Sequence, residues 1–143
     1  MPDQLVAGVD CSTQATKVVI VDVGDGRVVA DGYAPHVVSG VDGARETNPE
    51  IWWRALRDAI RQTGCARDVA AISVSAQQHG LVTLDRPAGR PVRPAILWND
   101  TRGSDAAADL IEDLGGAQVW AQEIGVVPVA SLTVASWSHL RRR

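Results

Sequence analysis

Residues 6–17 read VAGVDCSTQATK, and this stretch decides how the fold begins. An apolar segment carries the carboxylate of Asp10 into a turn of small hydroxylated residues, and the apolar residues 18–21 leave that turn. A strand, an acid, a small polar turn and a second strand can hold nucleotide phosphates, because turn amides donate hydrogen bonds to phosphate oxygens. The alternative is an ordinary hairpin in which Asp10 caps its own turn.

Composition narrows the class of protein. The chain has 143 residues, of which 45% are apolar and 22% are charged, so it can build a core and is not expected to be disordered. Its formal net charge of -3 gives no electrostatic reason to expect a nucleic-acid partner. No apolar run approaches the roughly 20 residues that span a bilayer. We therefore expect a soluble, cytoplasmic protein without a nucleic-acid or membrane partner.

Several common signatures are absent from the sequence. The two cysteines, Cys11 and Cys65, are far apart, and no group of residues has the spacing of metal ligands, so we expect reduced thiols. The chain contains no GxxxxGK[ST] phosphate loop, no GxGxxG and no GxSxG.

The pattern of apolar residues predicts an α/β or α+β fold that opens with a three-stranded antiparallel meander and continues with helices and further strands. The residues Gly24-Asp25-Gly26-Arg27 favour a hairpin turn between the second and third strands of the meander. The expected strands are residues 5–10, 17–23, 27–33, 69–75, 81–85 and 95–98. The expected helices are residues 48–63, 103–114, 117–124 and a last one from Ser131. This last helix has no stop signal, which suggests a truncated chain.

The helix from residue 48 has clear signals at both ends. Asn48 can cap it and Pro49 suits the first helical position, while Gly64 is a natural stop. The aromatic pair Trp52-Trp53 lies in its first turn. We expect both rings to pack in the core.

The turn after Asp10 carries the first candidate site. A carboxylate at the end of a buried strand is costly unless it is paired or holds a metal, and hydrated Mg²⁺ needs only one or two carboxylates. Ser12, Thr13 and Thr16 add hydroxyl groups, and Lys17 adds positive charge. This turn could therefore hold both a metal ion and phosphate groups.

Two more polar clusters follow apolar segments. Residues 76–80, AQQHG, offer amides and an imidazole that can bind a polyhydroxylated ligand, or they form only a polar loop between strands. Residues 98–102, WNDTR, offer Trp98 as a wall for an apolar sugar face. The alternative for this cluster is a salt bridge between Asp100 and Arg102 that caps the next helix. His36 and His139 are expected at the surface or in structural roles.

Four segments together resemble the N-terminal part of the FGGY family of carbohydrate kinases, and the resemblance covers essentially the whole chain. The matching segments are GVDCSTQATKVVIVD (8–22), ETNPEIWW (46–53), ISVSAQQHG (72–80) and RPAILWNDTR (93–102). The Gln-x-His-Gly of residues 77–80 and the ILWND of residues 96–100 are the more specific motifs. They resemble the members that phosphorylate D-xylulose rather than those that phosphorylate glycerol.

The resemblance implies a ribonuclease H-like (actin-like ATPase) fold and ATP-dependent, Mg²⁺-dependent phosphorylation of D-xylulose to D-xylulose 5-phosphate. Residues 1–143 would be the N-terminal portion of the sugar-binding domain, without the C-terminal domain. The full-length protein would be a homodimer in the cytoplasm. The alternatives are another kinase of the family, acting on ribulose or glycerol, and a non-catalytic fragment that binds a sugar or a partner chain.

The resemblance also assigns residues to roles. Asp10 would lie at the metal ion, which it would hold through water, and at the phosphates. The phosphate-binding hairpin would include Ser12, Thr13, Gln14 and Lys17. The sugar pocket would be lined or braced by Gln78, His79, Trp98, Asn99, Asp100 and Arg102.

Two departures from the family pattern concern the turn itself, and a third concerns catalysis. Ser12 stands where the family often has glycine, and Ala15 stands where glycine or serine is common. Family members are much longer, and their catalytic base, an aspartate, and their adenosine site lie beyond residue 143. We therefore expect the isolated chain to be inactive.

Overall fold

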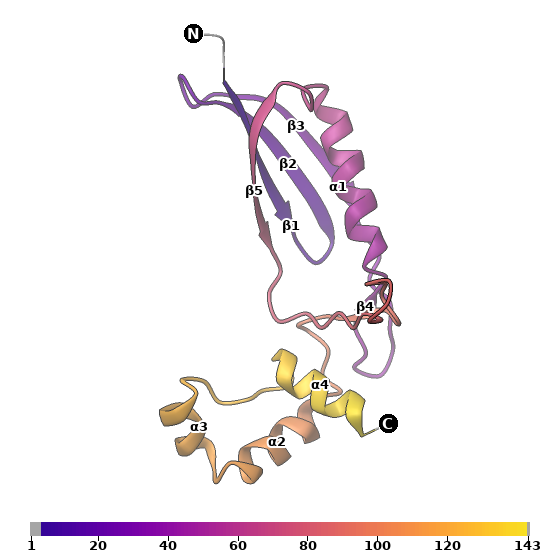
Figure 1. The fold of residues 1–143 in the computed structure, drawn as a ribbon, viewed down its shortest axis with the longest axis vertical. Helices are drawn as coiled ribbons and strands as arrows, with labels where there is room; N and C mark the ends of the chain where they lie inside the picture. Colours follow the sequence, from indigo (N-terminus) through magenta and orange to yellow (C-terminus); the bar gives the residue numbers. More distant parts are fainter. Residues whose placement is uncertain (1–3, 143) are drawn as a thin grey trace. The chain divides into compact units, whose positions relative to one another are not determined.

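The computed structural model describes residues 4–142, which form two compact units (Figure 1). The sheet unit consists of the residues up to Val38 together with Asn48–Gln77. The helical unit consists of Ser39–Thr47 and the residues from Gln78 onward. Residues 1–3 and 143 of the expected domain lie outside the described residues.

The sheet unit is built on four strands in the order β3-β2-β1-β5. The strands are β1 (Leu5–Cys11), β2 (Ala15–Asp22), β3 (Val28–Pro35) and β5 (Val69–Ala76). The first three pair antiparallel as a meander, and β5 pairs parallel with β1. The expected meander is therefore confirmed, as is the α/β, ribonuclease H-like fold class.

Local chemistry explains the link between β2 and β3. The N–H of Asp22 donates to the carbonyl of Arg27 at 2.9 Å, and the N–H of Gly26 donates to the carbonyl of Asp22 at 2.9 Å. Gly26 has a φ of +75°, which glycine adopts without a Cβ penalty. The Gly-Asp-Gly segment thus forms the hairpin that the sequence predicts.

One face of the sheet is covered by α1 (Glu50–Thr63), which Figure 1 shows running alongside the strands. Ala55 and Ala59 of this helix pack against buried strand residues such as Val18 and Ile20. Gly32 permits the close contact, because a Cβ there would lie 2.0 Å from the carbonyl oxygen of Ala59. Alternate strand residues face away from α1, and these include Asp10 and Lys17.

The ends of α1 lie where the sequence predicts them. The side chain of Asn48 accepts a hydrogen bond from the N–H of Glu50 at 3.0 Å, and Gly64 ends the helix with a φ of +69°. The expectation for the aromatic pair is wrong for Trp53, which is 59% exposed. The buried stripe of the helix is spaced by four residues at Ala55 and Ala59, and Trp53 lies two positions away from it.

The helical unit contains one short antiparallel pair and three helices. The pair is formed by β4 (Glu46–Thr47) and β6 (Ala95–Ile96), and the helices are α2 (Ser104–Asp113), α3 (Ala117–Glu123) and α4 (Thr133–Arg141). α2 packs against both α3 and α4. Gly115 and Gly116 donate backbone hydrogen bonds to the last turn of α2 and end it, as the sequence predicts.

The prediction of a strand at residues 81–85 is wrong, and the strand at 95–98 is shorter than predicted. Only isolated bridges join Leu81 to Ile96 and Leu84 to Pro91. The side chain of Asp85 accepts hydrogen bonds from the N–H groups of Ala88 and Arg90, so the segment forms a side-chain-stabilised turn. Pro91 and Pro94 lack the backbone N–H group that would form a hydrogen bond to a neighbouring strand. None of the helices found in residues 4–142 has the length and apolarity of a membrane span.

Candidate functional site

The turn between β1 and β2, residues 11–16, holds the first group of candidate residues. Its closure is local: the N–H of Ser12 donates to the carbonyl of Ala15 at 3.0 Å. The antiparallel register then places Lys17 directly opposite Asp10. The Nζ atom of Lys17 lies 3.5 Å from Oδ2 of Asp10. An acidic and a basic side chain, Asp10 and Lys17, therefore lie side by side on the sheet face that α1 does not cover.

The carboxylate of Asp10 is oriented and still accessible. Ser12 Oγ donates to Asp10 Oδ2 at 2.6 Å, yet the Asp10 side chain remains 47% exposed. A depression of about 390 Å³ opens at this point of the sheet. Its lining includes Gly8, Asp10, Lys17, Ser73 and Ser75. This end of the sheet can therefore receive a charged ligand.

Gln77 holds the turn from the β5 side. Its N–H donates to the carbonyl of Cys11 at 3.1 Å, and its Oε1 accepts a hydrogen bond from Thr13 Oγ1 at 3.3 Å. Its Nε2 is buried without a hydrogen-bond partner among the described residues. The sequence places Gln77 in a sugar-binding motif, whereas its contacts connect it to the β1–β2 turn.

His36 holds the turn from the β3 side. Its N–H donates to the carbonyl of Gln14 at 2.6 Å, and its Nε2 lies 2.8 Å from Oγ1 of the fully buried Thr16. Burial lowers the pKa of the His36 imidazole, and a weaker interaction with the Thr13 backbone opposes the shift. The neutral ring is thus favoured in the folded chain.

The second group of candidate residues forms an ion network in the helical unit. Arg102 Nη2 lies 2.7 Å from Oδ2 of Asp100 and 2.5 Å from Oε1 of Glu46. Arg93 Nη2 lies 2.6 Å from the same Glu46 oxygen. The backbone N–H of Arg45 also donates a hydrogen bond to Oδ2 of Asp100 at 2.8 Å. Two segments that are distant in sequence, residues 45–46 and 93–102, therefore meet at two carboxylates.

Electrostatics keep this network charged. Burial acts to raise the pKa of Asp100, which is only 3% exposed, but hydrogen bonds from Arg102 and from backbone N–H groups outweigh it and lower that pKa. The same contacts raise the pKa of Arg102 above its ordinary value. Asp100 and Arg102 therefore form a salt bridge with each other, as the alternative interpretation of this cluster predicted. The salt bridge braces the loop that carries Trp98 and Asn99.

The remaining sugar-site candidates differ in exposure. Trp98 is 45% exposed, and Oδ1 of Asn99 is buried without a hydrogen-bond partner among residues 4–142. Gln78 and His79 are both exposed. His79 has a φ of +62°, which is unusual for a residue with a side chain, and Thr133 Oγ1 donates to its carbonyl at 3.1 Å. The loop that carries the imidazole is thus held in an uncommon conformation.

The structure groups the candidate residues into two sets. Asp10, Ser12, Thr13, Gln14 and Lys17 share the sheet unit. Gln78, His79, Trp98, Asn99, Asp100 and Arg102 share the helical unit. Sequence reasoning missed Glu46 and Arg93, because no local pattern connects positions that are 47 residues apart. It also gave His36 no part in the turn.

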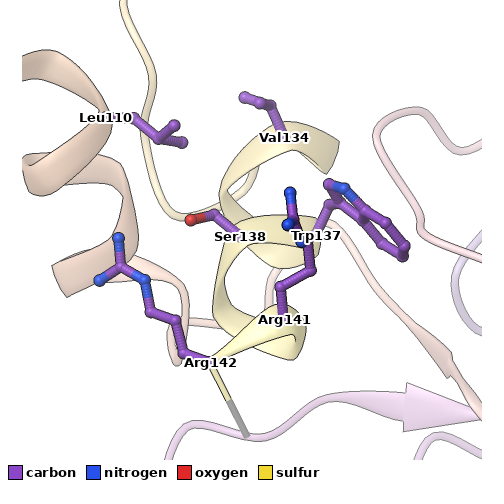
Figure 2. Close-up of a pocket in the computed structure, with 6 residues that line it drawn as sticks. All are labelled: Leu110, Val134, Trp137, Ser138, Arg141 and Arg142. Carbon is purple, nitrogen blue, oxygen red and sulfur yellow. The ribbon is translucent and has the colours of Figure 1, made fainter. Parts of the chain in front are cut away.

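A separate hollow lies between α2 and α4 and contains none of the expected site residues. Its volume is about 320 Å³, and Figure 2 shows its lining: Leu110, Val134, Trp137, Ser138, Arg141 and Arg142. Arg142 forms an ion pair with Asp109 of α2. Trp137 and Arg141 are four residues apart and share one face of α4. This hollow is a consequence of helix packing, and nothing connects it to the two candidate sets.

The chain matches the model of the FGGY family of carbohydrate kinases, N-terminal domain, over residues 5–140. Among curated proteins, it is 57% identical over 137 residues to the xylulose kinase of Streptomyces coelicolor and 56% identical over 137 residues to that of Streptomyces rubiginosus. Each alignment covers 95% of this chain and 28% of the relative. The chain therefore spans little more than a quarter of the length of these relatives.

Solved structures of carbohydrate kinases also resemble this chain. The crystal structure of xylulose kinase from Bifidobacterium adolescentis superposes with a TM-score of 0.89 at 39% identity, covering 98% of this chain and 29% of that chain. The structure of Plasmodium falciparum glycerol kinase with ADP has a TM-score of 0.79 at 20% identity, covering 94% of this chain and 28% of that chain. The second likeness concerns the fold alone.

Proposed function

Because the chain belongs to the FGGY family of carbohydrate kinases, we propose that it is the N-terminal part of an enzyme that transfers phosphate from ATP to D-xylulose. The observation that carries the proposal is the pairing of an accessible Asp10 with Lys17 and Ser12 on the open sheet face. The names of the relatives support D-xylulose as the substrate.

In this proposal Asp10 holds the Mg²⁺ ion through water. The fit is supported by the half-exposed carboxylate, which can accept hydrogen bonds from metal-bound water. Residues 4–142 contain no group of three or more potential metal-ligating side chains. A single carboxylate suits Mg²⁺, which keeps several waters and takes the rest of its ligands from phosphate oxygens. The ion neutralises charge on the transferred phosphoryl group.

The phosphates of ATP would lie on the β1–β2 turn. The turn residues Ser12, Thr13 and Gln14 offer hydroxyl and backbone N–H donors. Lys17 contributes a cation that can contact either Asp10 or a phosphate oxygen, because it is a flexible and exposed side chain. The turn would thus orient the phosphate tail before transfer.

The sugar would lie on the residues of the helical unit. Gln78 and His79 supply directional hydrogen bonds to hydroxyl groups. Trp98, which is 45% exposed, supplies an apolar wall, and Asn99 follows it on the same loop. Asp100 and Arg102 keep this loop in place through their ion pair with each other.

The proposal places residues 1–143 in the N-terminal portion of the sugar-binding domain. The relatives extend well beyond the aligned region, since this chain covers 28% of their length. The catalytic base and the adenosine-binding groups would lie in that additional part. A cytoplasmic location, a role in xylose metabolism and a homodimer of the full-length protein belong to the same proposal.

A chimeric enzyme tests the function. Residues 5–140 of this chain would replace the matching segment of the Streptomyces coelicolor xylulose kinase, and ADP release would be measured with D-xylulose, D-ribulose and glycerol. We expect D-xylulose to give the highest kcat/KM. A folded chimera that prefers ribulose or glycerol would overturn the substrate, and a folded but inactive chimera would overturn the kinase role of these residues.

A further inference from the structure

His36 is the one imidazole that contacts the β1–β2 turn in the part of the chain that the structure describes. It lies just after β3 and is 8% exposed. Its backbone N–H bonds to Gln14 at 2.6 Å, and its side chain reaches Thr16 at 2.8 Å. Both contacts are on the β3 side of the turn, opposite the side that Gln77 holds.

Two contacts meet at the Thr16 hydroxyl group. Thr16 Oγ1 lies 2.8 Å from Nε2 of His36 and 3.6 Å from the sulfur of Cys11. The imidazole donates to or accepts from this hydroxyl group according to its tautomer. The chain of contacts runs from His36 through Thr16 to Cys11, the residue that follows Asp10.

We propose that His36 is a positioning residue for the β1–β2 turn: its Nε2 atom forms a hydrogen bond with Thr16 and so keeps the turn in register beside Asp10. The inference rests on the proposed function, in which this turn binds the phosphates. A turn at the end of a sheet can open locally unless tertiary contacts hold it, because its backbone groups lie beyond the strand ladder. The buried imidazole and Gln77 fix the turn from opposite sides.

Amide hydrogen exchange on the 143-residue chain tests the positioning. In His36→Ala the backbone bond to Gln14 is retained, so only the imidazole contact is removed. We expect the Ser12 amide, which closes the turn, to exchange about tenfold faster relative to the core amide of Ile20, the size of effect of losing one buried hydrogen bond. Thr16→Val should have the same effect, and the double variant should add nothing further.

Two control variants separate positioning from general loosening. His36→Gln retains a hydrogen-bonding group, an amide that can donate or accept, at a similar reach and should restore slow exchange at Ser12. Thr63→Ala removes another buried hydroxyl, one that donates to the carbonyl of Ile60 at the far end of α1, and should leave the ratio of Ser12 to Ile20 exchange unchanged. An unchanged Ser12 rate in His36→Ala, or an equal effect of Thr63→Ala, would overturn the inference.

A titration with MgATP tests the proposed function separately. Wild-type chain titrated with MgATP should show amide shifts at residues 12–17, and these should weaken in His36→Ala and return in His36→Gln. Absence of shifts in the wild-type chain would count against phosphate binding by the isolated turn, while the exchange results would still decide the positioning role.

Discussion

Ser12 Oγ donates a 2.6 Å hydrogen bond to Oδ2 of Asp10, so one of the two turn residues expected to depart from the family pattern contacts the carboxylate of the proposed metal site directly. Serine at this position therefore orients the acid from within the turn. The contact leaves the Asp10 side chain 47% exposed, and the carboxylate can still face a ligand.

Replacing Asp10 by Asn in the chimeric enzyme should lower kcat by at least about 100-fold, the order of effect of losing one preorganised charged group. The fold should be retained, because the side chain is half exposed and its amide can still accept from Ser12. Coupled ADP release and circular dichroism measure the two quantities. Activity equal to that of the unmodified chimera would refute the role of Asp10.

The isolated 143-residue chain should show no D-xylulose-dependent ADP release. Phosphoryl transfer depends on enclosing the nucleotide and the acceptor between groups in the correct geometry, and a missing base alone costs about 10²–10⁴-fold. A coupled assay with the chimera as the positive control measures this. Turnover by the isolated chain above the blank would contradict the prediction.

Gly32→Ala should destabilise the sheet unit by about 1–3 kcal/mol, the usual cost of overpacking. The added Cβ would lie 2.0 Å from the Ala59 carbonyl oxygen, so α1 has to move away from β3. Urea unfolding measures the change. Gly8→Ala is the matched control, because its Cβ would meet only a Val19 methyl at 3.3 Å, and its effect should be much smaller.

The folded helical unit should lose stability as the pH falls below 3.8, the ordinary pKa of an aspartate. The folded pKa of Asp100 lies below that value, so its stabilisation is complete above pH 3.8 and disappears as the pH passes through the folded pKa. Denaturant unfolding at graded pH, followed by Trp98 fluorescence, measures the loss. In Asp100→Asn the pH dependence should be weaker and the stability lower throughout.

His36 should make the sheet unit less stable as the pH falls below 6.5. Because burial lowers the folded pKa, the unfolded chain takes up a proton first, and the stabilisation is complete only above the unfolded pKa. Unfolding of the chain between pH 7.5 and 5.5 measures the slope. His36→Gln should remove most of it, whereas an unchanged slope would assign it to another group.

Local signals in the sequence predicted the sheet unit well. The Asp10 turn, the glycines of the second hairpin and the Asn48-Pro49 start of α1 each act within a few residues, and each lies where it was expected. The same reasoning failed at residues 81–85, where apolar side chains suggest a strand but Asp85 binds its own turn. It also failed for Trp53, because a helix face is chosen by its partner.

The sequence by itself determined the family, the order of the elements and the residues of the β1–β2 turn, because these depend on neighbours along the chain. Only the tertiary structure decided that His36 and Gln77 hold this turn from two sides, and that Glu46 joins Arg93 and Arg102. Such contacts join residues far apart in sequence, and their strength depends on the geometry, charge and burial that packing creates. They become visible only when packing brings the donors and acceptors within hydrogen-bond distance.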